Sequence, residues 1–226
     1  MRDAEMANDL QSDGLDLRVS LFSDLRVSKC GLDFEHQAQN EGFRFVAGVD
    51  EVGRGCLAGP VVAAACVLDP AKALPKGLND SKKLTAKRRE EIAAELKELV
   101  VGYSIARIEA EIIDEINILE ATKKAMYLAI ANLQPQADFL LIDALQLKQI
   151  FLPQKAIIKG DAISASIAAA SILAKTYRDE LMREYDHTYP QYGFSSHVGY
   201  GTKIHLDALR LFGHCPLHRK TFRGVL

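Results

Sequence analysis

The chain has 226 residues, of which 48% are hydrophobic and 26% are charged. These proportions fit one globular domain with a sizeable core and exclude a chain that is disordered throughout. The formal net charge of −2 excludes a strongly basic protein, so a nucleic-acid partner would have to be bound by local basic clusters.

The first forty residues are polar and rich in acids, and they contain the pentapeptide DLRVS twice, at 16–20 and 24–28. Two copies of five residues are too few for a repeat protein. The opening MRDAEMANDL is acidic and polar, whereas a signal peptide needs a basic start followed by an apolar run, so we expect a cytoplasmic protein. We interpret residues 1–40 as a poorly ordered polar extension, with a small substrate-contacting appendage as the alternative, and residues 41–226 as the folded domain.

Apolar segments predict three strands and one helix in the first half of this domain. FRFVAGVD (43–50) ends in acidic residues followed by glycines, the pattern of a buried strand that enters a tight loop. PVVAAACVL (60–68) and YSIARI (103–108) predict two more strands. A helix is expected from about Thr85 to Val100, with the basic residues 87–89 on its exposed face. Even 60–68 is far shorter than the roughly 20 residues that span a bilayer, so no membrane segment is expected.

The second half alternates helices with strands. A helix is expected over roughly 117–133, and ADFLLID (137–143) and KAIIK (155–159) predict strands. The next helix, 164–186, begins with small side chains that allow a close approach to a neighbouring backbone, and the last helix, 202–212, has a threonine N-cap and a following glycine. We therefore predict an α/β fold: a mixed central sheet flanked by helices, with a helical C-terminal part.

Four cysteines are widely spaced and form no CxxC pair. This pattern argues against a disulfide framework and a zinc ribbon, and it fits reduced thiols in a cytosol. His214, Cys215 and His218 lie close in sequence, but no fourth ligand stands at a suitable spacing, which argues against zinc.

Acidic residues stand at three predicted strand ends or strand-to-helix junctions: Asp50 with Glu51, Asp143, and Asp161. Magnesium retains waters and binds a few carboxylates together with a substrate phosphate. Two such ions about 3.5–4 Å apart can activate a water and stabilise the leaving oxygen when a phosphodiester is cut. Each acid alone is more simply a solvated loop carboxylate or a cap, so the metal-site hypothesis depends on their joint placement.

Asp50 and Glu51 are adjacent, and adjacent strand residues point to opposite faces of a sheet. The two side chains therefore cannot bind the same metal ion if the strand is regular. We therefore expect the strand to end or bulge at these acids, where the glycines of VGRGCLAGP allow unusual backbone angles.

The glycine spacing of this loop resembles a dinucleotide-binding fingerprint. Two features oppose that interpretation: the segment after the loop is strand-like where a helix should begin, and two carboxylates beside the loop would repel a pyrophosphate. The backbone of Gly53, Arg54 and Gly55 is instead suited to close approach to a sugar-phosphate chain, and contact with a ribose 2′-hydroxyl is how proteins distinguish RNA from DNA.

Several other residues are weaker candidates. Lys82, in NDSKK, is suited to a backbone phosphate, with a solvated lysine as the alternative. Tyr200 is suited to stacking on a base or sugar, with a packing aromatic as the alternative. Lys175 and Arg178 share a helix face and suit either phosphate contact or pairing with neighbouring acids.

Long motifs now identify a family resemblance. GVDEVGRGCLAGPVVAAACVL (48–68) closely resembles the signature of the bacterial ribonuclease HII family, and later blocks agree with it in order and spacing across most of the chain after residue 43. These blocks are LNDSKKL (78–84), LLIDAL (140–145), KGDAISASIAAASILAKTYRD (159–179), YPQYGF (189–194), HVGYGTKIH (197–205) and HCPLHRKTF (214–222).

The resemblance implies that 41–226 is a ribonuclease H-like catalytic domain. It implies an endonuclease that hydrolyses RNA in RNA/DNA hybrids and cuts at single ribonucleotides in duplex DNA, leaving 5′-phosphate and 3′-hydroxyl ends, as in ribonucleotide excision repair. It also implies a monomer whose cofactor is magnesium or manganese, with two ions in the active complex.

By motif position the resemblance implies roles for individual residues. Asp50, Glu51 and Asp143 correspond to metal ligands and Asp161 to the fourth acid of the site. The family's GRG motif falls on 53–55, and its junction-sensing tyrosine falls on Tyr200, both beside the scissile bond.

Two departures from the family pattern matter. Ala144 follows Asp143 where many relatives have glycine, and the N-terminal extension has no matching motif. The GCLAGP loop fits ribonuclease HII better than ribonuclease HIII. The alternatives are a non-catalytic nucleic-acid-binding module with the same fold and an NAD(P)-dependent oxidoreductase.

Overall fold

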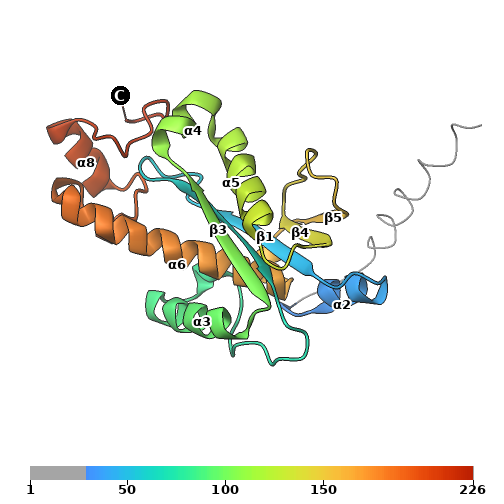
Figure 1. The fold of residues 1–226 in the computed structure, drawn as a ribbon. Helices are drawn as coiled ribbons and strands as arrows, with labels where there is room; N and C mark the ends of the chain where they lie inside the picture. The colour runs from blue at the N-terminus through green and yellow to red at the C-terminus, as the bar shows by residue number, and fades with distance from the viewer. Residues whose placement is uncertain (1–28, 226) are drawn as a thin grey trace, which may run out of the picture.

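The structure is a computed structural model that describes residues 29–225, and Figure 1 shows its elements. Five strands in this range form one mixed sheet in the order β3-β2-β1-β4-β5. Antiparallel pairing joins β1 to β2 and β2 to β3, whereas β4 runs parallel to β1 and β5 runs parallel to β4. The strands are β1 (Val46–Val52), β2 (Val61–Val67), β3 (Gly102–Ile108), β4 (Phe139–Asp143) and β5 (Gln154–Ile157).

Helices cover both faces of this sheet (Figure 1). On one face, α3 (Ala86–Leu99) and α6 (Ala165–Thr188) pack on Val62 and Ala64 of β2. On the other, α5 (Ile118–Asn132) packs on the alternate residues of the same strand. Because β2 is buried on both faces, its sequence is apolar throughout. The predicted α/β fold with a mixed sheet is confirmed.

The long helix α6 lies directly on β1. A side-chain carbon added at Gly48 would stand 2.0 Å from the carbonyl carbon of Ser166 and 2.3 Å from the amide nitrogen of Ile167. Ala168 and Ala169 in the next turn have no exposed surface. The small residues at the start of the helix therefore permit the close approach that the sequence predicted, and they place α6 beside the end of β1 that carries the acids.

Beyond α6, the chain builds a helical C-terminal part with its own small core. It contains α7 (Phe194–His197) and α8 (Lys203–Phe212), which pack with Tyr192 and with Met182 of α6. Thr202 caps α8 by accepting a hydrogen bond from the amide of His205, as the sequence predicted. None of the helices in residues 29–225 combines the length and the apolar character needed to cross a bilayer.

Neither α7 nor two further helices were predicted from the sequence. The first, α2 (Asp33–Asn40), lies inside the segment interpreted as a polar extension, yet Phe34 and Ala38 are buried with Phe139 in a small apolar cluster. The second, α4 (Ala110–Ile116), has only seven residues and is separated from α5 by Asn117, whose φ is +67°. Both copies of DLRVS lie outside the described residues.

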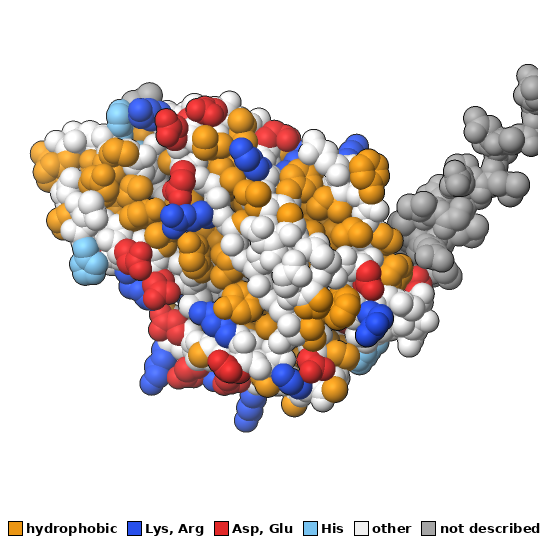
Figure 2. All heavy atoms as spheres, viewed as in Figure 1, with side chains coloured by type: hydrophobic (Ala, Val, Ile, Leu, Met, Phe, Trp, Pro, Cys, Tyr) orange, Lys and Arg blue, Asp and Glu red, His pale blue; other side chains and the backbone are white. Residues whose placement is uncertain are grey.

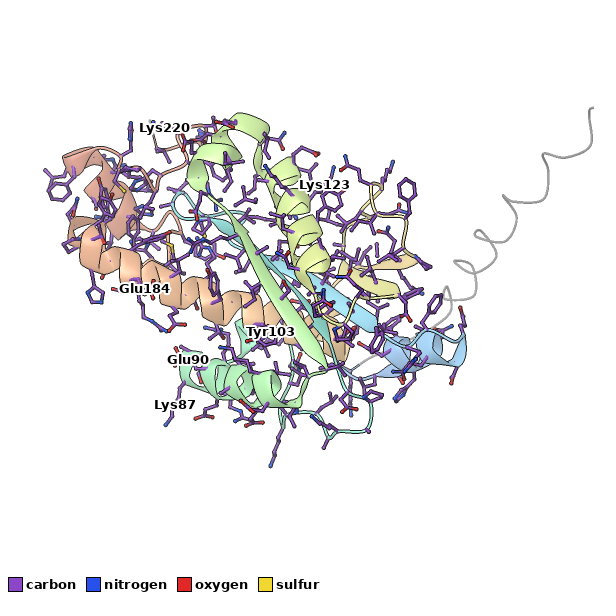
Figure 3. All side chains as sticks on the ribbon, viewed as in Figure 1. Lys87, Glu90, Tyr103, Lys123, Glu184 and Lys220 are labelled. Carbon is purple, nitrogen blue, oxygen red and sulfur yellow. The ribbon has the colours of Figure 1, made fainter. Side chains whose placement is uncertain are left out.

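The outer side of α3 carries mixed charges. Figure 2 shows acidic and basic side chains interspersed over this helix, and Figure 3 shows Lys87 and Glu90 on its outer side. Ion pairs join Glu90 to Arg183 at 3.0 Å and Arg88 to its own helix. Arg89, expected on the exposed face, is instead buried, and it donates a hydrogen bond to the carbonyl of Ser81 because α3 turns that residue toward α6.

Candidate active site

Asp50 and Glu51 lie on a part of β1 that stays regular through Val52. Asp50 is paired with Ala64 and Glu51 with Ala63, without a bulge. The expected break at the acids is therefore wrong, because continuous pairing with β2 keeps the strand extended until Gly53, where φ becomes +89°. Asp50 shares the α6 face with Gly48, and Glu51 projects from the opposite face at the end of the strand.

Asp50 is a nearly buried carboxylate with 4% of its surface exposed. One oxygen accepts a hydrogen bond of 2.7 Å from the amide of Glu51. Burial, and next the negative charge of Glu51, hold the pKa of Asp50 well above its ordinary value, although the Ser171 hydroxyl acts in the opposite direction. A buried carboxylate in such surroundings binds a proton or a cation more readily than one in water.

Glu51 has one paired oxygen and one unpaired oxygen. Its Oε1 forms an ion pair of 3.0 Å with the Arg54 guanidinium, whereas its Oε2 is buried and has no hydrogen-bond partner among the described residues. Burial raises the pKa of Glu51 even though Arg54 lowers it. An orphaned carboxylate oxygen beside a second buried acid is a ligand that suits a hard cation.

Asp143 ends β4, which runs parallel to β1. The pairing of Val49 with Ile142 brings Asp143 alongside Asp50, and the charge of Asp143 raises the pKa of both Asp50 and Glu51. Burial is the main cause of the raised pKa of Asp143 itself, and its Oδ1 accepts a hydrogen bond of 2.7 Å from the Gly160 amide.

Ala144, which follows Asp143, departs from the family pattern, and its backbone conformation shows why many relatives have glycine there. Ala144 has a φ of +51°, in the left-handed region that favours glycine. Its amide donates to the carbonyl of Ile157 at 3.0 Å, which fixes the turn directly after Asp143. The alanine thus adopts the backbone that glycine takes more readily, at a cost of about 1–2 kcal/mol.

Asp161 lies in the short helix η2 (Gly160–Ala162), just before α6, and is buried. The ammonium of Lys82 stands 3.6 Å from its Oδ2. Partial burial lowers the pKa of Lys82, but the charges of Asp161, Asp50 and other acids outweigh it and raise the pKa overall. Lys82 therefore neutralises part of the acidic charge while its side chain stays largely exposed.

The four acids are neighbours at one end of the sheet without forming a closed cage. Within residues 29–225, no three histidine, cysteine, aspartate or glutamate side chains stand close enough to hold a metal ion as placed. The unpartnered Oε2 of Glu51 and the buried carboxylate of Asp50 nevertheless fit a divalent cation, because both supply the oxygen ligands that a hard cation prefers.

The turn after Glu51 exposes Arg54 and Gly55 between buried residues. Gly53 must be glycine, because an added side-chain carbon would stand 2.3 Å from Nε of Arg178 and its φ is positive. Gly55 differs: its φ is ordinary, and no atom of the described residues lies within 4 Å of the position of an added carbon. The fold does not require glycine there, so the open space is available to a ligand. The loop leads into β2 and not into a helix, unlike a dinucleotide-binding loop.

Tyr200 lies beside this turn, in the loop between α7 and α8, with 42% of its surface exposed. The amide of Leu57 donates to the carbonyl of Gly199 at 2.8 Å, which ties the two loops together. His205 contacts the Tyr200 carbonyl at 2.9 Å from its Nδ1. The structure thus places the loop of Tyr200 beside the loop that follows Asp50 and Glu51.

Two buried arginines bind the backbone of this region, and their burial was not predicted. Arg178 was interpreted as a phosphate contact or the partner of a nearby acid, but it is fully buried and donates to the carbonyls of Ala58, Pro60 and Val198. Lys175 does pair with an acid, at 2.6 Å from Asp179. Helical periodicity was the available signal, because Arg178 shares its face with the buried residues Ala174, Leu181 and Met182. The second arginine, Arg219, is also fully buried.

Comparisons with known proteins agree with the motifs. A family model described as ribonuclease HII matches residues 47–225. The chain is 56% identical over 191 residues to the ribonuclease HII of Ruminiclostridium cellulolyticum, covering 84% of this chain and 74% of that protein. It is 60% identical over 193 residues to the ribonuclease HII of Chlamydia caviae, covering 85% and 90%. The crystal structure of ribonuclease H2 from Pyrococcus horikoshii matches with a TM-score of 0.68 and 26% identity, covering 80% of this chain and 95% of that chain.

Proposed function

Because this chain belongs to the ribonuclease HII family and is a ribonuclease H-type endonuclease that acts on nucleic acid, we propose a specific substrate and mechanism. The substrates are RNA/DNA hybrids and duplex DNA with single embedded ribonucleotides, and the products carry 5′-phosphate and 3′-hydroxyl ends. One observation carries the proposal: the exposed turn at Arg54 and Gly55 directly follows the acids of β1. A nucleic-acid strand that is bound at this turn presents a backbone phosphate to the acids.

Asp50, Glu51, Asp143 and Asp161 are proposed to hold two divalent ions, magnesium or manganese. Bound ions supply an activated water and stabilise charge on the leaving 3′ oxygen. The chain contributes the placement: Asp50 and Asp143 are fixed by adjacent parallel strands, and the Oε2 of Glu51 is left without a protein partner. The protein thus needs no nucleophilic side chain of its own.

We propose that the ammonium of Lys82 leaves the acids and contacts the substrate when metal ions are bound. Its ammonium lies near Asp161 and feels the charge of Asp50 and Asp143. Cations bound by the acids would remove that attraction, and the exposed lysine would then contact a backbone phosphate. Arg54, paired with Glu51, is proposed to contact the same strand.

The direct test is incubation with a duplex that carries one ribonucleotide, with and without magnesium or manganese. We expect a metal-dependent nick at the ribonucleotide, with a 5′-phosphate and a 3′-hydroxyl at its ends. An identical all-DNA duplex is the control and should stay intact. Absence of cutting in both metals, or a 3′-phosphate product, would contradict the proposal.

Gly55→Ala tests whether the open space at the turn receives the substrate. The structure leaves room for the methyl group, so the free energy of unfolding is expected to change by less than about 1 kcal/mol. Cleavage of the single-ribonucleotide duplex is expected to fall by about a hundredfold, the effect of displacing a reacting group by about 1 Å. Urea unfolding and kcat/KM are the measurements, and an unchanged kcat/KM would place the substrate elsewhere.

Tyr200→Ala tests recognition beside the scissile bond. The half-exposed ring is expected to stack on the nucleotide, and stacking on an aromatic ring contributes roughly 1–3 kcal/mol per base. Cleavage at a lone ribonucleotide should therefore fall by about tenfold, and cleavage of a long hybrid should fall less because it offers many 2′-hydroxyls. Tyr200→Phe is the control and should retain most activity. Equal losses on both substrates would remove Tyr200 from ribonucleotide sensing.

A further inference from the structure

Arg219 is a buried cation whose hydrogen-bond partners are backbone carbonyls of the glycine loop. Its NH2 donates to Gly53 at 2.7 Å and to Gly59 at 2.9 Å, its NH1 donates to Arg54 at 2.9 Å, and its Nε donates to Gly59 at 3.1 Å. Its side chain has no exposed surface. Burial lowers its pKa to about 10, so the guanidinium remains charged at neutral pH.

The segment that carries Arg219 is itself fixed. The amide of Arg219 donates to the carbonyl of Leu57 at 2.9 Å. The next amide, of Lys220, donates to the carboxylate of Asp114 at 2.8 Å, and Figure 3 shows Lys220 beside the end of α4. The guanidinium therefore reaches the turn from a rigid support.

The direction of the carbonyls determines the direction of the amides. In a planar trans peptide, the C=O and N–H groups point in opposite directions, and the bonds that join Gly53, Arg54 and Gly55 are trans. The carbonyls of Gly53 and Arg54 point inward to Arg219, so the N–H groups of Arg54 and Gly55 point outward. Both residues are exposed, and neither amide donates a hydrogen bond within residues 29–225.

From this arrangement we propose that Arg219 is a positioning residue: it turns two carbonyls inward so that the amides of Arg54 and Gly55 face the 2′-hydroxyl oxygen of the ribonucleotide. The inference rests on the proposed function and deepens it. A guanidinium suits the task because its planar fork reaches three carbonyls at once, whereas a lysine ammonium is a single point charge. Its charge also polarises the peptide groups it binds, which strengthens the outward donors.

The test uses Arg219→Lys in the full chain, with Arg89→Lys as the matched control. Arg89 is also buried and donates to a backbone carbonyl, that of Ser81, away from the turn. Binding is measured by fluorescence anisotropy in EDTA, with one duplex that contains a single ribonucleotide and the same duplex made of DNA only. The measured quantity is the ratio of the two dissociation constants, which a general loss of stability does not change.

The wild type and Arg89→Lys are expected to bind the ribonucleotide duplex more tightly than the all-DNA duplex. In Arg219→Lys, the ratio of the two dissociation constants is expected to fall by about fivefold, which corresponds to the loss of one hydrogen bond. A wild-type preference in Arg219→Lys would overturn the inference and leave the proposed function intact. A wild type that neither prefers nor cuts the ribonucleotide duplex would overturn the proposed function itself.

A second measurement decides the question if Arg219→Lys does not fold. In the wild type, hydrogen exchange at the amides of Arg54 and Gly55 is expected to slow in the ribonucleotide duplex and not in the all-DNA duplex. Equal exchange in the two complexes would overturn the inference.

Discussion

Replacing Asp50 with asparagine is expected to lower kcat in saturating magnesium by a factor on the order of 10³, the loss seen when one electrostatic group is removed from an active site. Asparagine keeps the shape of the side chain and its oxygen can still accept the hydrogen bond from the Glu51 amide. What is lost is the negative charge that is proposed to bind the cations. The measurement is single-turnover cleavage of the single-ribonucleotide duplex across a magnesium titration.

The same variant makes a prediction about stability. Burial holds the pKa of Asp50 above its ordinary value, so the folded chain holds this proton more tightly than the unfolded chain does. The carboxyl therefore contributes stability at low pH, and this contribution is lost as the pH rises through the folded-state pKa. In EDTA, the Tm of the wild type should fall relative to that of Asp50→Asn as the pH rises. Added magnesium or manganese should raise the Tm of the wild type and raise that of the variant less.

Asp207→Asn is the control for Asp50→Asn. Asp207 lies on α8 in exposed ion pairs with Lys203 and Arg210, so its loss should leave cleavage and the metal-dependent rise in Tm unchanged. Full activity of Asp50→Asn in magnesium would refute the proposed metal site.

Replacing Gly48 with alanine is expected to have the largest effect on stability. The free energy of unfolding should fall by about 3 kcal/mol or more, the upper end of the range for substitutions that overpack a core. The new carbon would stand 2.0 Å from the carbonyl carbon of Ser166. That contact is with backbone, which cannot rotate away as a side chain can. The helix α6 would have to move off β1, and Asp50 lies two residues further along the same face.

Urea unfolding measures this effect, with Gly55→Ala as the matched control. Both substitutions add one methyl group to the same stretch of chain, but only Gly48 faces backbone atoms. Equal free energies of unfolding for the two variants would show that α6 does not lie on β1 as described.

The sequence predicted the elements whose signal is local. The strand at 60–68 is observed as Val61–Val67, and the helix at 164–186 as Ala165–Thr188, because apolar composition and small residues along one segment decide both. The threonine cap of α8 is equally local and is confirmed. The position of Asp143 is local in the same sense, because it is the last residue of a strand that the apolar run 137–143 predicted.

What the sequence did not predict depends on distant partners. The break expected at Asp50 and Glu51 is absent because pairing with β2, itself a separate segment, keeps β1 extended. The carbonyls that Arg178 and Arg219 bind were not predicted, because most of them lie more than a hundred residues away along the chain and every residue type offers a carbonyl. No motif marks such a contact.

The long sequence separation between Arg219 and the glycine turn means that the two are synthesised at different times. The guanidinium contacts Gly53 across 166 positions of the chain, so the glycine turn leaves the ribosome long before the residue that orients it. Asp143 and Asp161 likewise emerge well after Asp50. A nascent chain thus carries Asp50, Glu51 and the glycine turn before it carries the residues that lie beside them in the folded protein.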